Sequence, residues 1–171
     1  YTQFGIWGEL AVQEAQKFCE VKVVADTSRT GYKHVLDQDY WLDYSDCAYL
    51  YTVDNETING VELGFSPKIE GIPLVSDMSS NLLSREFNVN DYGLIFASAQ
   101  KNIGPAGITI VIVREDLLQR AEHSPLLPKM MDYRQHADKN SMLNTPATYS
   151  WYMASLVLKW MKKKGGVKYF E

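Results

Sequence analysis

The sequence predicts an α/β fold with a mostly parallel sheet, and two observations support this prediction. Short apolar runs rich in Ile, Val and Phe alternate with stretches in which apolar residues recur at helical spacing. Such alternation is typical of helices packed against parallel strands. Several of the apolar runs also end in clusters of polar residues, and open α/β sheets bind ligands at the carboxyl ends of their strands. We therefore expect a site at one edge of the sheet.

The composition of the chain argues against several classes of protein. The chain has 171 residues and a net charge of −4, so its length suits one domain and its charge gives no support for nucleic-acid binding. No apolar run has the length of a membrane span, and the first residues lack the pattern of a signal peptide. Cys19 and Cys47 are most simply free thiols, so we expect a cytoplasmic protein. Three scattered histidines give no zinc-ligand spacing.

The expected elements can be placed in order along the chain. Apolar residues at helical spacing predict an amphipathic helix from Ile6 to about Cys19. A second short helix is expected at 115–120. Runs bounded by turn residues predict buried strands, and these lie at 21–25, 48–52, 72–75, 94–97 and 108–113.

The last predicted element is a strong helix. Thr145 suits its N-cap, Pro146 its first position and Gly165 its left-handed C-cap. One face, at helical spacing, is expected to be buried and comprises Tyr149, Tyr152, Met153, Leu156, Val157 and Trp160.

Three polar clusters follow predicted strands, at 54–57, 76–80 and 98–101. Because the strands are expected to be parallel, the clusters should meet at one site. The last cluster contains Lys101, which lies between two predicted buried strands and beside a Gly-Pro-Ala-Gly turn. Such a lysine is poorly explained as a solubilising charge, and it is a candidate reactive amine with a pKa lowered by desolvation or by a neighbouring cation.

A cationic ring that carries an aldehyde and a phosphate would use all of these side chains. Lys101 would form an imine, and Asp77 would pair with the protonated ring nitrogen. Trp7 would stack on the ring, while Thr57 and Gln100 would hold the phosphate. Each residue also has a simpler explanation: Lys101 as a solvent-facing charge, Asp77 as a helix cap, Trp7 as a core residue and Thr57 as a turn cap.

The chain resembles the phosphoserine aminotransferases, which are pyridoxal-phosphate enzymes of fold type I in the class V aminotransferase group. The most specific block is 99–107, which reads Ala-Gln-Lys-Asn-Ile-Gly-Pro-Ala-Gly. The similarity covers nearly all of the chain. Further blocks occur in the same order at 5–11, 55–60, 76–81, 92–97, 112–118 and 144–146, with Lys159-Trp160 and Gly165-Gly166 near the end.

The resemblance implies a role for each candidate. Lys101 would bind pyridoxal 5′-phosphate (PLP) covalently and shuttle the proton between substrate and cofactor. Asp77 would pair with the pyridine nitrogen, and Trp7 would stack on the ring. Two further residues of the polar clusters would also contact the cofactor, Thr57 near the ring oxygen O3′ and Gln100 at the phosphate. The phosphate of a neighbouring subunit's cofactor would be reached by Asn144 and Thr145, so the resemblance implies a homodimer with shared active sites.

The resemblance also implies an activity and a partial domain. It implies amino-group transfer between L-glutamate and 3-phosphohydroxypyruvate, which are small-molecule substrates, in serine biosynthesis. Residues 1–171 would form part of the PLP-binding large domain, a three-layer sandwich, without the family's N-terminal segment and C-terminal small domain. The start without Met and the end soon after Gly165-Gly166 agree with that expectation. Two alternatives stay open: a related class V enzyme with another substrate, and a non-catalytic fragment.

Overall fold

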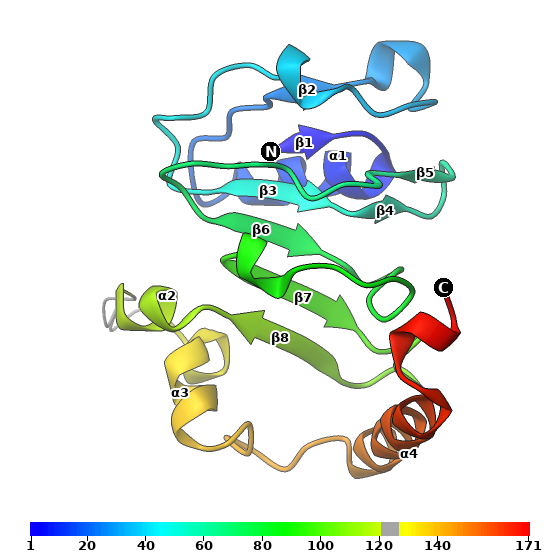
Figure 1. Ribbon diagram of the computed structural model, residues 1–171. Helices are drawn as coiled ribbons and strands as arrows, with labels where there is room; N and C mark the ends of the chain where they lie inside the picture. Colours follow the sequence, from blue (N-terminus) through cyan, green and yellow to red (C-terminus); the bar gives the residue numbers. More distant parts are fainter. Residues whose placement is uncertain (121–126) are drawn as a thin grey trace.

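The centre of the protein is a four-stranded sheet, seen in the computed structural model in Figure 1, which describes residues 1–120 and 127–171. The strands pair in the order β3 (Leu50–Val53), β6 (Leu74–Asp77), β7 (Leu94–Ser98) and β8 (Thr109–Val113). The first three strands are parallel, and β8 runs antiparallel to β7. The predicted α/β class with a largely parallel sheet is thus confirmed.

Smaller elements surround this sheet. Helix α1 (Ile6–Ala15) packs beside β1 (Thr2–Gln3), β3 and β4 (Asn55–Glu56). No helix in the described part of the chain is long and apolar enough to cross a membrane. Two-stranded sheets pair β1 (Thr2–Gln3) with β2 (Ala25–Asp26) and β4 (Asn55–Glu56) with β5 (Val61–Glu62). The α-helices are α1 (Ile6–Ala15), α2 (Glu115–Arg120), α3 (Tyr133–Asp138) and α4 (Thr148–Lys164). Single 3₁₀ turns lie at Ser28–Thr30, Gln38–Tyr40, Val89–Asp91, Lys129–Met131 and Val167–Tyr169.

The core lies on the sheet, where alternate strand residues point inward. Leu50, Leu74 and Ile95 come from three adjacent strands, and each is only 1% exposed. They pack in one cluster with Ala97 and Ile103, the second of which follows β7. Burial of this apolar surface fixes the register of the strands, because a slip of one residue would turn each strand's apolar side chains to the opposite face.

The turn after β7 is held by α4. Ser150 Oγ donates a hydrogen bond to Ala106 O at 2.6 Å. A Cβ added to Gly104 would lie only 3.4 Å from the backbone of Ala154. The close approach explains why α4 has small residues on the side that faces this turn. It also restrains the segment that carries Lys101.

Several boundaries differ from those predicted. Helix α1 ends at Ala15 rather than near Cys19. The predicted strand at 21–25 is reduced to Ala25–Asp26, because the backbone of Val24 makes single hydrogen bonds to Tyr1 and Leu42 instead of a ladder. Helix α4 starts at Thr148, so the predicted capping residues of this helix, Thr145 and Pro146, precede it and Ala147 is its N-cap.

The predicted buried faces of β8 and α4 are also wrong. Strand β8 is largely exposed, and Ile112 at 40% exposure shows that this edge of the sheet is only partly covered. Helix α4 buries Ser150 and Ala154 against the turn at 104–107, where only small side chains fit, and it buries Met161 nearer its C-terminal end. Most of its large apolar residues are exposed, namely Tyr149, Trp151, Tyr152, Leu156, Leu158 and Trp160. At its other end the helix has the predicted left-handed cap, Gly165.

Candidate active site

The three polar clusters meet, as the parallel strands require. Lys101 Nζ donates a hydrogen bond to Thr57 Oγ1 at 2.7 Å, which joins the cluster after β7 to the cluster after β3. Ser79 Oγ accepts from the backbone N–H of Ser98 at 3.1 Å. Asn55 Nδ2 donates to Ser80 Oγ at 2.9 Å. Each pair of clusters is therefore connected by at least one direct hydrogen bond.

Lys101 lies on the turn that follows β7 and is exposed. The prediction that this lysine is desolvated by its own chain is thus wrong for the described residues. Its amine is instead oriented by the Thr57 hydroxyl. A lysine that is both oriented and accessible can react with a ligand that enters from solvent.

Asp77 is the last residue of β6, one strand away from the strand that leads to Lys101. In the sheet Asp77 pairs with Phe96 on β7 and with Val53 on β3. Its Oδ1 accepts a hydrogen bond from the backbone N–H of Ser79 at 2.8 Å. This bond closes a local turn, and the described residues that follow β6 form no α-helix before β7, so the simpler prediction that Asp77 caps a helix is wrong. The same bond fixes the orientation of the half-buried carboxylate.

Trp7 lies in the first turn of α1, with 45% of its surface exposed. Its backbone N–H donates to Glu56 Oε2 at 2.9 Å, and Glu56 immediately precedes Thr57. The Glu56 carboxylate therefore connects the backbone of Trp7 to the segment that contains Thr57, which holds Lys101. This arrangement differs from that of a core tryptophan, which would be buried.

Glu56 is part of the site, but the sequence analysis did not predict a role for it. It is only 1% exposed. Burial raises the pKa of its carboxyl, the N–H groups of Gly8 and Trp7 lower this pKa, and the charge of Asp77 raises it again. Glu56 belongs to the polar cluster at 54–57. Its partners, the N–H groups of Trp7 and Gly8, are too distant in sequence for a local pattern to predict the contact.

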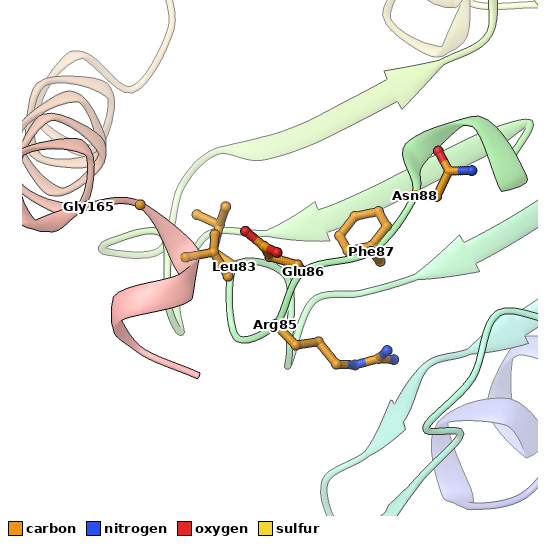
Figure 2. Close-up of a pocket in the computed structure, with 8 residues that line it drawn as sticks. Leu83, Arg85, Glu86, Phe87, Asn88 and Gly165 are labelled. Atoms are coloured by element: carbon orange, nitrogen blue, oxygen red, sulfur yellow. The ribbon is translucent and has the colours of Figure 1, made fainter.

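Gln100, Asn144 and Thr145 are not connected to Lys101 by hydrogen bonds in the described structure. Gln100 is exposed next to the lysine. Asn144 and Thr145 line a separate cleft of about 910 Å³ between β8, α3 and α4. The pocket in Figure 2, about 650 Å³, lies between the segment that contains Arg85 and the end of α4. Neither cavity is lined by the predicted catalytic residues Lys101 and Asp77.

The site thus combines an accessible lysine on the turn after β7 with a carboxylate at the end of the neighbouring parallel strand, β6. The model of the aminotransferase class-V family matches residues 1–171. The chain therefore belongs to the aminotransferase class-V family.

Particular relatives are phosphoserine aminotransferases. The one from Pseudomonas entomophila is 48% identical over 171 residues, which are all of this chain and 47% of that protein. The structure of the one from Bacillus circulans subsp. alkalophilus has a TM-score of 0.94 at 38% identity, over 99% of this chain and 46% of that chain. A PLP-bound phosphoserine aminotransferase from Trichomonas vaginalis has a TM-score of 0.87 at 40% identity, over 98% of this chain and 50% of that chain. The chain thus spans about half the length of these relatives.

Proposed function

We propose that the protein carrying this chain uses PLP to transfer an amino group from L-glutamate to 3-phosphohydroxypyruvate, giving 2-oxoglutarate and O-phospho-L-serine. The observation that supports this most directly is the Lys101–Thr57 hydrogen bond of 2.7 Å, made next to the strand that ends in Asp77. Residues 1–171 would be the PLP-binding part of the large domain. The free thiols of Cys19 and Cys47 agree with a cytoplasmic location.

The described residues fit PLP in three respects. The Lys101 amine is accessible and its position is set by one hydroxyl. Asp77 has one oxygen bound to Ser79 N–H, which orients the carboxylate without neutralising its charge. Trp7 supplies an exposed aromatic surface on the adjoining helix turn. An amine, a carboxylate and an aromatic ring are the three groups that a phosphorylated pyridine aldehyde needs.

Each side chain then has a defined task. Lys101 Nζ provides the nucleophile and later carries the proton between the substrate Cα and the cofactor. Thr57 Oγ1 accepts a hydrogen bond from the amine and keeps it on the side of the sheet where Asp77 lies. With PLP bound, Asp77 would hold a proton on the ring nitrogen by its negative charge. PLP, when bound, supplies the electron sink that neither lysine nor carboxylate can provide.

The proposed enzyme is a homodimer with shared sites. Asn144 and Thr145 lie exposed in the segment before α4, at a distinct cleft. They would contact the phosphate of the cofactor bound by the second copy, while Gln100 would contact the phosphate in its own subunit.

Lys101→Ala tests the assignment in the full-length natural protein supplied with PLP. The unchanged protein should turn yellow, lose the colour on borohydride reduction and carry the reduced adduct on the peptide that contains Lys101. The variant should show no adduct and no transamination. Lys17→Ala is the control, because Lys17 is an exposed lysine paired with Glu14 on α1 and should behave as the parent. Transamination by the Lys101→Ala variant would refute the role of this lysine.

The substrate is tested separately. With L-glutamate as donor, the phosphorylated keto acid should be used far better than hydroxypyruvate. Equal use of both acids would assign the chain to a related class V enzyme with a different acceptor.

A further inference from the structure

Glu56 binds the first turn of α1 although it lies far away in sequence. Its two carboxylate oxygens accept hydrogen bonds from consecutive backbone N–H groups, that of Trp7 at 2.9 Å and that of Gly8 at 2.8 Å. Asn59, on the same β4–β5 hairpin, accepts from Ile6 N–H at 3.1 Å. Three N–H groups that have no partner within the helix are thus bound by one hairpin.

The helix is shaped to receive this carboxylate. A Cβ added to Gly5 would lie 2.4 Å from Glu56 Cδ, and one added to Gly8 would lie 3.0 Å from Glu56 Oε1. Any other residue at position 5 would therefore displace the carboxylate. The N-cap residue of α1 is Gly5 itself, so it has no side chain that could cap the helix locally.

An ordinary helix cap would not require this arrangement. A serine or aspartate at the N-cap would satisfy the free N–H groups from within the same segment. A buried carboxylate instead loses its hydration, and the loss is only partly offset here by two charge-assisted hydrogen bonds and the positive end of the helix dipole. What the distant carboxylate adds is a fixed distance between α1 and the hairpin.

The two segments joined by Glu56 both carry site residues. On one side its partner is the N–H of Trp7, whose ring is exposed. On the other side the next residue is Thr57, which holds Lys101 Nζ. The Glu56 carboxylate therefore lies between the first turn of α1 and the segment that holds Lys101.

We propose that Glu56 is a positioning residue that sets the Trp7 ring and the Thr57 hydroxyl at one separation, that of a PLP ring attached to Lys101. This inference rests on the proposed function for its ligand. Loss of the carboxylate would leave the sheet and Lys101 in place but would free the first turn of α1. The cofactor would then lose its stacking partner more than its covalent attachment.

Two variants remove the contact in different ways. Glu56→Gln keeps the shape of the side chain but replaces one acceptor oxygen by a donor that faces a backbone N–H. Gly5→Ala keeps the charge and pushes the carboxylate away through the added methyl group. Glu62→Gln is the matched control, because Glu62 is on the same hairpin, faces Arg85 rather than α1 and is half-exposed. Circular dichroism would verify that each variant is folded.

The first readout needs no cofactor. Comparing each protein with its Trp7→Phe counterpart isolates the fluorescence of Trp7. Glu56→Gln and Gly5→Ala should change the emission and acrylamide quenching of Trp7, and Glu62→Gln should not. The second readout is a titration with PLP, in which the first two variants should bind about tenfold more weakly, as expected for loss of one aromatic stacking contact. PLP should also quench Trp7 less in these variants.

The outcomes separate the two proposals. Folded Glu56→Gln and Gly5→Ala variants with parental Trp7 emission and PLP affinity would overturn the role of Glu56, and adduct formation at Lys101 would leave the proposed function intact. If the unchanged full-length protein forms no adduct at Lys101, the proposed function fails and the role of Glu56 toward PLP fails with it.

Discussion

Replacing Arg85 by methionine should expose how strongly the loop after β6 depends on one buried ion pair. Arg85 Nη2 donates to Asp54 Oδ2 at 2.7 Å, and the Asp54 side chain is only 2% exposed. Asn81 Nδ2 donates to the same oxygen. Asp54 Oδ1 is buried with no hydrogen-bond partner in the described structure. Methionine keeps much of the length of the arginine stem but leaves the carboxylate with one neutral donor.

The cost can be estimated from these contacts. Removing one partner of a fully buried ion pair costs roughly 3–5 kcal/mol. Arg85 is itself 24% exposed, and Asn81 still donates one hydrogen bond, so we expect a smaller loss of about 2–3 kcal/mol in the free energy of unfolding. Urea unfolding of the full-length protein, followed by circular dichroism, would measure the difference.

Two further variants make the measurement decisive. Arg114→Met removes the same side chain from the exposed pair with Asp116 and should cost less than about 0.5 kcal/mol. Adding Asp54→Asn to Arg85→Met should recover part of the loss, because it removes the uncompensated charge. If Arg85→Met costs no more than Arg114→Met, or if Asp54→Asn lowers stability further, the buried charge is not what makes Arg85 necessary.

Two other predictions concern the site. Burial raises the pKa of Glu56 above its ordinary value of 4.5, so its protonated form favours the folded state. Its contribution to stability is complete below the unfolded pKa and is lost as the pH rises through the folded pKa. Relative to Glu56→Gln, the parent should therefore lose stability upward from about pH 4.5, as measured by unfolding at a series of pH values; a constant difference would contradict the raised pKa. Thr57→Val removes the hydroxyl that holds Lys101 and should slow adduct formation with PLP about tenfold, which corresponds to roughly 1.4 kcal/mol, within the range of one ordinary hydrogen bond. Thr57→Ser should retain the parental rate, and equal rates in all three proteins would exclude a role for the hydroxyl.

The convergence of the polar clusters was predictable, because it depends only on strand direction. Once the strands before Thr57, Asp77 and Lys101 are taken as parallel neighbours, their carboxyl ends must lie at one edge. The register of β6 and β7 and the Lys101–Thr57 hydrogen bond confirm this placement. The chemical role of each residue stays a prediction, since it depends on a cofactor and on residues beyond this chain.

The predictions that are wrong concern places where the distance between two elements, rather than the periodicity of the sequence, decides which side chains are buried. In α4 the large residue Tyr152 follows the expected helical stripe, yet the helix turns Ala154 toward the sheet, because the turn containing Gly104 approaches too closely for a large side chain. The role of Glu56 escaped detection for a related reason. Its carboxylate and its partner Trp7 are 49 residues apart, and no local pattern connects them.

The strand order has a consequence for the sequence of events in folding. β7 and β8 adjoin in the chain and pair antiparallel, so the turn that carries Lys101 needs only a short loop to close. The pairings of β3 with β6 and of β6 with β7 are parallel and nonlocal, and such contacts form slowly. We therefore expect the lysine to be displayed on a hairpin before Thr57 and Asp77 arrive beside it. Tight capture of the cofactor would then mark the completion of the sheet, and its absorbance would report the last step of folding rather than the first.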